Sequence, residues 1–259
     1  MYYYIFESPK NSSERTYYER IRDIAREFSI AGEVTQSSPA RSADELTQMG
    51  INKNYSTIVA IGSDEHVNKV ASQIVLSNPP FPLAMGIIST DSKSMLHERW
   101  GFKKPEDACE TLKYRKLERF DVGLIEPDRY FLTSARIECS KPSRITLEVD
   151  RWKAEAIIDR IEISGNLYIL LERFLKEGSG LKAAFNWLVG KESIAADRSV
   201  FKAKIIRLSS QHPLPVMIGN EVVAKTPINI YRKLNALNII TKRDKVIQAD
   251  AQGDRKLDS

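Results

Sequence analysis

The chain is poor in cysteine and histidine. Among 259 residues, Cys109 and Cys139 are the only cysteines, so the sequence can build neither a disulfide framework nor a thiolate metal cluster. This composition favours a reducing compartment, and we expect a cytoplasmic protein. His66, His97 and His212 are the only histidines, and they show neither a metal-ligand spacing nor that of a catalytic triad. We therefore predict no metal site.

Long apolar runs are also lacking, because Lys, Asp or Arg interrupts each one before it reaches the length of a membrane span. The N-terminus lacks the basic region and cleavage site of a signal peptide. The net charge of +5 and the pI of about 9.0 permit contact with anionic lipid or nucleic acid. The densest basic cluster comprises Lys113, Arg115, Lys116 and Arg119. Such a run is most often a solvated surface.

No nucleic-acid-binding motif is visible, and the sequence leaves open both a homodimer and a peripheral contact with a lipid or membrane surface. No Walker loop, nucleophile elbow or zinc motif is present either.

What the sequence does contain is a strand, a turn and a helix between residues 55 and 75. Residues 58–61 (IVAI) form an apolar run typical of a strand buried on both faces. Gly62 and Ser63 end this run, and the apolar residues of 67–75 then recur on one face of a helix. In α/β proteins this turn lies at the carboxyl end of a parallel strand, where ligands usually bind. The helix N-terminus there favours anions.

Strands and helices alternate on both sides of this stretch. Strands are predicted over residues 2–6, 33–36 and 83–88, and helices begin at Asn11, at the capping box of Ser42 and Glu45, and at Pro105. This alternation predicts right-handed βαβ units and a mostly parallel sheet. We therefore predict an α/β fold that begins with a three-layer, nucleotide-binding-like α/β domain over residues 1–126.

From Arg129 onward strands follow strands. The pattern predicts strands within residues 144–149, 156–163, 167–171 and 201–208, a short helix over 181–189, and a hairpin around Gly219 and Asn220. We assign residues 127–243 to a β-rich, sandwich-like domain. Residues 244–259 are polar and aperiodic, which predicts a disordered tail.

Several motifs together resemble the superfamily of diacylglycerol, sphingosine and NAD kinases. Its loop Gly-Gly-Asp-Gly-Thr is matched by Gly62 and Asp64, and its Asn-Pro-x-Ser-Gly turn by Pro9. Its Asp-Val-Gly step is similar to residues 121–123, and its late Glu…Thr-Pro segment to Glu221 and residues 226–227. The resemblance implies two domains with a cleft between them, ATP and Mg²⁺ as cofactors, and transfer of a phosphoryl group to a lipid or nucleotide hydroxyl. It also implies nucleotide-binding positions, which are Gly62, Ser63, Asp64, His66 and Ser92.

The motifs depart from the family pattern where they should bind phosphate. Glu65 brings a carboxylate to the turn that should receive an anion, although Asp64 and Glu65 would suit a helix cap that binds none. The later motif Pro-x-Gly-Thr-x-Asn-Asp-x-Ala-Arg is almost wholly replaced over residues 89–98, with Ser92 in place of its Thr. His66 could donate to an anion, but a lone histidine on a helix is usually a surface residue.

We therefore predict a degenerate member of the family, a pseudokinase that acts by binding or scaffolding, for which ATP and Mg²⁺ bind weakly or are not used. The alternative is an active kinase that uses Asp64, a weak candidate for a catalytic residue, in an altered loop.

Overall fold

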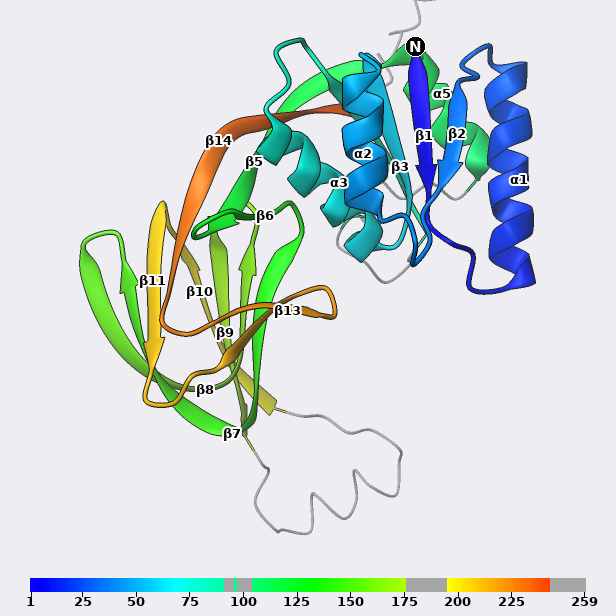
Figure 1. Cartoon of the computed structure of the whole chain (residues 1–259). Coiled ribbons are helices and arrows are strands. Elements are labelled where there is room, and N and C mark those ends of the chain that lie inside the picture. Colours follow the sequence, from blue (N-terminus) through cyan, green and yellow to red (C-terminus); the bar gives the residue numbers. More distant parts are fainter. Residues whose placement is uncertain (91–95, 97–103, 176–194, 243–259) are drawn as a thin grey trace, which may run out of the picture.

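The computed structural model describes residues 1–90, 96, 104–175 and 195–242. Figure 1 shows an α/β region formed by the first part of the chain beside a region built from strands. This arrangement confirms the predicted fold class. The predicted helix over residues 181–189 and the predicted tail over residues 244–259 lie outside the described residues. The domain boundary at residues 126/127 stays a prediction.

The α/β region is organised around four parallel strands in the order β2-β1-β3-β4. These are β1 (Tyr2–Phe6), β2 (Glu33–Gln36), β3 (Thr57–Gly62) and β4 (Ala84–Ser89). Every residue of β3 and β4 is buried, as the continuous apolar run predicted. The carboxyl ends of these strands therefore meet at one edge of the sheet, where the predicted loop lies.

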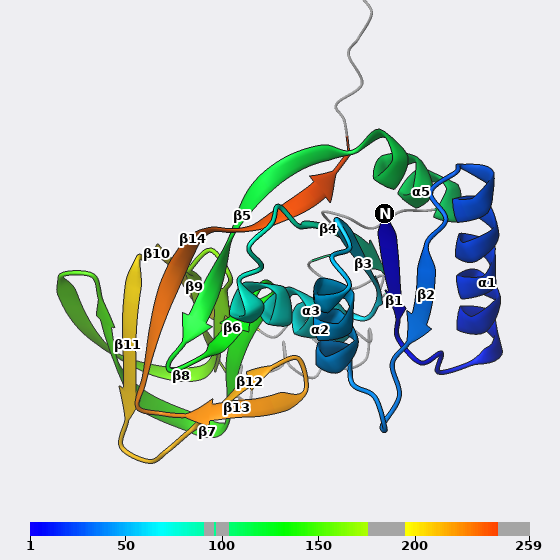
Figure 2. The same cartoon turned by 45° about the horizontal axis from the view of Figure 1, so that its top comes forward.

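Helices cover both faces of this sheet and make three layers. Helices α1 (Ser12–Glu27) and α5 (Pro105–Tyr114) pack on one face, and α2 (Ala43–Asn52) and α3 (Asp64–Ser77) on the other (Figure 2). The predicted starts are confirmed, because the side chain of Asn11 caps α1 and a complete capping box opens α2. Each face of the sheet has its own hydrophobic core.

The β-rich region is antiparallel and surrounds a separate core. Its strands are β5 (Lys116–Ile125), β6 (Arg129–Phe131), β7 (Ser134–Val149), β8 (Trp152–Ser164), β9 (Tyr168–Leu175), β10 (Ala195–Lys202), β11 (Ile205–Ser210), β12 (Pro215–Ile218), β13 (Glu221–Lys225) and β14 (Ile228–Thr241). The single strand predicted over residues 201–208 is wrong, because the chain turns at Ala203 and Lys204 between β10 and β11. The predicted hairpin around Gly219 and Asn220 is confirmed as β12 and β13.

Strand β14 joins the two regions into one hydrogen-bonded sheet. Its first residues pair with β11, whereas Asn238 and Ile239 pair in parallel with β4. Strand β5 runs antiparallel to β14 along both segments, with a register shift between Lys233 and Leu237. The chain therefore returns to the first region at its end, and the buried Ile239 and Ile240 complete the cores beside the parallel strands.

Candidate functional site

The predicted loop lies between the end of β3 and the first turn of α3. Gly62 ends the strand with a φ of +155°, and Ser63 caps the helix, because its Oγ accepts a hydrogen bond from the backbone N–H of His66 at 3.4 Å. The predicted cap at Asp64 and Glu65 is wrong, since the cap is Ser63 and both acidic residues lie within the first turn of the helix. Their carboxylates still complement the positive end of the helix dipole.

The side chain of Glu7 occupies this loop. The backbone N–H of Ser63 donates to Glu7 Oε2 at 2.6 Å, and Ser63 Oγ donates to Glu7 Oε1 at 2.9 Å. Glu7 is itself held in place, because its own N–H donates to the carbonyl of Ile61 at 2.8 Å. A Cβ on Gly62 would lie 2.6 Å from the Cβ of Glu7, so the close approach requires glycine. An internal carboxylate thus takes the donors that an anion would use.

His66 faces the interior, so the expectation of a surface histidine is wrong. The residue is 4% exposed, and its Nε2 lies 3.0 Å from the carbonyl oxygen of Ile5, to which it donates as the neutral tautomer. Burial lowers the pKa of His66, although the hydrogen bond to Ile5 acts in the opposite direction. The imidazole therefore links α3 to β1 and stays uncharged near neutral pH.

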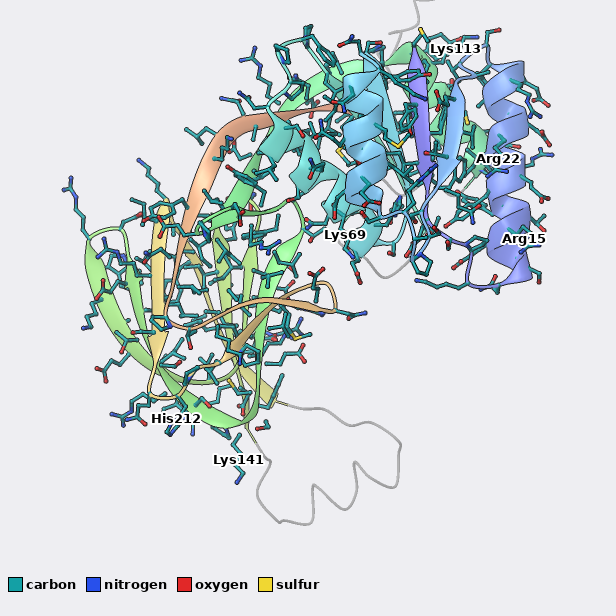
Figure 3. The ribbon with its side chains drawn as sticks, in the orientation of Figure 1. Arg15, Arg22, Lys69, Lys113, Lys141 and His212 are labelled. Carbon is teal, nitrogen blue, oxygen red and sulfur yellow. The ribbon has the colours of Figure 1, made fainter. Side chains whose placement is uncertain are left out.

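The tip of the β12–β13 hairpin lies against the same helix turn. A Cβ on Gly219 would come within 3.2 Å of the Glu65 side chain, and Gly219 has a φ of +61°. Lys69 Nζ lies 3.0 Å from a carboxylate oxygen of Glu65 and 3.7 Å from one of Glu221 on the hairpin. Figure 3 shows Lys69 on the side of α3 that faces this hairpin. The β-rich region therefore contacts the loop through Glu65, the residue that departs most from the family motif.

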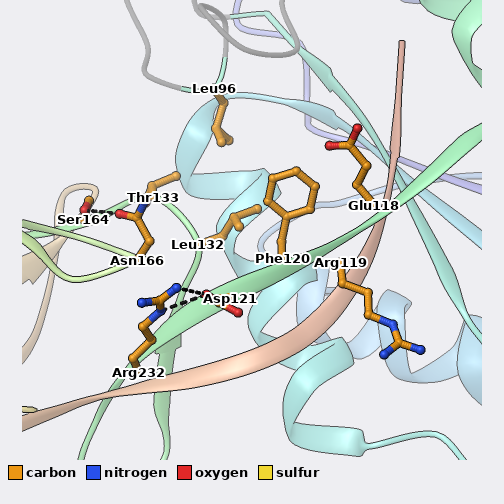
Figure 4. A pocket seen from close by; sticks show the side chains of 11 residues that line it. Leu96, Glu118, Arg119, Phe120, Asp121, Leu132, Thr133, Ser164, Asn166 and Arg232 are labelled. Carbon is orange, nitrogen blue, oxygen red and sulfur yellow. Dashed lines mark hydrogen bonds and ion pairs between the residues drawn. The ribbon is translucent and has the colours of Figure 1, made fainter. Parts of the chain in front are cut away.

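A cavity of about 280 Å³ lies where the two regions meet (Figure 4). Its apolar wall is formed by Leu96, Phe120 and Leu132. Its polar lining comes from β5, β14, the end of β8 and two turns, and consists of Glu118, Arg119, Asp121, Thr133, Ser164, Asn166 and Arg232 together with Gly165. This position agrees with the predicted cleft between the α/β and β-rich parts of the chain.

Two charged groups of this cavity, Arg232 and Asp121, are engaged with each other. Arg232 Nε donates to a carboxylate oxygen of Asp121 at 2.8 Å, and the backbone N–H of Asn235 donates to the other oxygen at 2.7 Å. Burial would raise the pKa of Asp121, but the hydrogen bonds from Asn235 and Arg232 hold it below its usual range. Arg232 is thus neutralised by a protein carboxylate.

The described residues contain no group of three or more His, Cys, Asp or Glu side chains placed to hold a metal ion. Of the predicted nucleotide-binding residues, the structure brings Gly62, Ser63, Asp64 and His66 together on one turn, whereas Ser92 lies outside the described residues. Within the described part of the chain, no helix is long and apolar enough to cross a membrane.

Sequence reasoning missed Glu7, because the family motif begins one residue later and gives position 7 no role. It also missed Asn68, whose Oδ1 accepts the backbone N–H of Leu132 at 2.7 Å and thereby joins α3 to the β-rich region. The sequence did contain a signal for Asn68, because this polar residue lies on the apolar face of a predicted helix.

The parallel strands with helices on both faces, followed by an antiparallel β-rich region, define an α/β protein whose strand–loop–helix turn lies at the carboxyl ends of the strands. Residues 5–125, a little under half of the chain, match the family model of the diacylglycerol kinase catalytic domain. A comparison with curated protein sequences gave no match.

Solved structures share the fold over nearly the whole chain. A diacylglycerol kinase from Bacillus anthracis str. Sterne superposes with a TM-score of 0.69 at 14% identity, covering 93% of this chain and 96% of its own. A candidate diacylglycerol kinase from the same organism gives a TM-score of 0.71 at 14% identity, with the same coverage. Yeast NADH kinase in complex with NADH gives 0.50 at 10% identity, covering 100% of this chain and 90% of its own. At these identities the likeness concerns the fold alone.

Proposed function

We propose that this protein is a pseudokinase of the diacylglycerol kinase family, which acts by binding or scaffolding and not by phosphoryl transfer. The observation that supports the proposal most directly is the Glu7 carboxylate on the N–H and hydroxyl of Ser63. A phosphate that used the same donors would lie beside this carboxylate. Two like charges about 4 Å apart repel by ~1 kcal/mol in water and by ~4 kcal/mol at an effective dielectric of 20.

Two further features also argue against phosphate binding and phosphoryl transfer. Glu65 adds a second carboxylate to the same helix turn, where it pairs with Lys69 and packs against Gly219. Phosphoryl transfer also needs Mg²⁺ ligands and a base for the accepting hydroxyl, placed together. Asp64 is one carboxylate in the first turn of α3, and the described residues add no metal-binding group beside it.

Thermal denaturation with Mg-ATP, with Mg-ADP and without nucleotide tests the proposal. A ligand that binds only the folded state raises the midpoint according to its concentration relative to its Kd. We expect no shift with either nucleotide, and no phosphorylation of diacylglycerol or NAD by the protein. A nucleotide-dependent shift together with turnover would establish the alternative, an active lipid or NAD-type kinase with an altered loop.

A further inference from the structure

A basic and apolar surface lies where α5 passes into β5, and we define it as the α5–β5 patch. It comprises Lys113, Tyr114, Arg115, Leu117 and Lys242. Tyr114 and Leu117 are each 51% exposed. Lys242 directly follows Thr241, which pairs with Lys116 at the start of β5. Three cations and two large apolar side chains therefore share a short stretch of surface.

The cations of this patch are available for an external partner. Within the described part of the chain, none of Lys113, Arg115 and Lys242 forms an ion pair, whereas the neighbouring Lys116 lies 3.0 Å from a carboxylate oxygen of Glu118. Lys113 Nζ lies 5.3 Å from the ring centroid of Phe28 and 5.6 Å from that of Tyr114. Its ammonium thus sits between two aromatic rings at the surface.

The patch lies far from the candidate nucleotide loop. The Tyr2 hydroxyl donates to the carbonyl of Leu112 at 2.8 Å, which places the end of α5 beside the amino end of β1. Ser63 follows the carboxyl end of β3, which runs parallel to β1. The two sites therefore lie at opposite edges of the parallel sheet. In Figure 3 Lys113 and Lys69 are correspondingly at opposite ends of the α/β region.

We propose that the α5–β5 patch docks this protein on an anionic lipid surface. Cations attract acidic headgroups, while Tyr114 and Leu117 can enter the interface between headgroups and acyl chains. The exposed leucine favours a bilayer over a nucleic acid, since an aliphatic side chain gains little from a phosphate backbone. This inference rests on the proposed function and deepens it, because it names an anionic bilayer as the binding partner of the scaffold. When the α5–β5 patch contacts the bilayer, the nucleotide loop at the opposite edge of the parallel sheet stays remote from it.

The test uses the full chain and flotation with two kinds of vesicle. One consists of phosphatidylcholine alone, and the other of phosphatidylcholine with phosphatidylserine. We expect binding to the anionic vesicles only, and weaker binding at high salt. Each cation that is neutralised should weaken binding about fivefold, so the double variant Lys113→Gln with Arg115→Gln should bind about 25-fold more weakly. The variant Tyr114→Ser with Leu117→Ser should weaken binding while leaving the net charge unchanged.

The matched control is Arg151→Gln with Lys204→Gln, which removes the same charge from two exposed residues of the β-rich region. It should bind like the parent. The proposal is overturned by absence of binding to anionic vesicles, by equal losses in the patch and control variants, or by tight binding of a short oligonucleotide that competes with the vesicles. Circular dichroism verifies that each variant folds. The assay contains no nucleotide, so its failure is distinct from a failure of the pseudokinase proposal, which Mg-ATP binding would reveal.

Discussion

Asn68 Oδ1 on α3 lies 2.7 Å from the backbone nitrogen of Leu132, the residue that follows β6. The same oxygen lies 3.4 Å from both the backbone nitrogen and the Oγ1 of Thr133. Asn68 is 5% exposed, so water cannot replace it. One amide oxygen thus accepts hydrogen bonds from the turn after β6 and so links α3, the helix that follows the loop, to the β-rich region.

Replacing Asn68 by alanine should therefore lower the free energy of unfolding by about 1–3 kcal/mol, because buried N–H groups lose their acceptor. Asn68→Asp keeps the acceptor and should retain more of the stability than alanine at neutral pH. Chemical denaturation measures both. As a control, Asn52→Ala removes an exposed amide from the end of α2, and it should change stability much less. Equal, small losses for Asn68→Ala and Asn52→Ala would show that the contact is dispensable.

The second prediction concerns Glu7. Glu7→Gln keeps an oxygen that can accept from Ser63 and removes the negative charge, so we expect higher affinity for Mg-ATP or inorganic phosphate. The repulsion that it relieves is on the order of 1–4 kcal/mol. Isothermal titration of parent and variant gives the comparison. The exposed Glu19→Gln carries the same charge change on α1 and should bind like the parent. Unchanged affinity in Glu7→Gln would refute the blocking role.

The third prediction restores glycine at the two loop positions where the kinase family has it. Ser63→Gly with Glu65→Gly should raise affinity for ATP or phosphate and lower thermal stability. Glycine costs up to ~1 kcal/mol inside a helix, and loss of the N-terminal carboxylate costs ~0.3–1 kcal/mol more. Calorimetric titration with Mg-ATP and a thermal melt measure the two effects. Tight ATP binding by the parent, weakened by the glycines, would instead show a specialised and working loop.

The fourth prediction is a pH dependence that arises from His66. Burial lowers its pKa in the folded protein, so the unfolded chain takes up a proton at a higher pH than the folded protein does. The contribution of the neutral His66 to the free energy of unfolding is complete above the pKa of the unfolded chain, about 6.5. This contribution is lost as the pH falls towards the lower pKa of the folded protein, by at most ~1.4 kcal/mol per pH unit.

His66→Gln should therefore show a smaller loss of thermal stability between neutral and mildly acidic pH than the parent. The exposed His212 offers a matched control, because His212→Gln should lose stability with acid as the parent does. Identical pH profiles for the parent and His66→Gln would contradict the buried, neutral imidazole.

The sequence alone determined the elements of the α/β region and the position of the loop. Periodicity and capping residues are local signals, so Asn11, Ser42 and the apolar run of residues 58–61 indicated helix starts and a buried strand before any tertiary contact was known. The motif spacing around Gly62 likewise pointed to the family that residues 5–125 match.

Only the tertiary structure decided what occupies the loop and what holds it. Glu7 meets Ser63 because parallel pairing places the ends of β1 and β3 side by side, and His66 is buried because α3 packs across β1. Strand β14 returns to β4 from the far end of the chain, and Gly219 reaches Glu65 in the same way. These contacts join residues far apart in sequence, and pairings of this kind leave no periodic or local signature, since they depend on how whole elements pack.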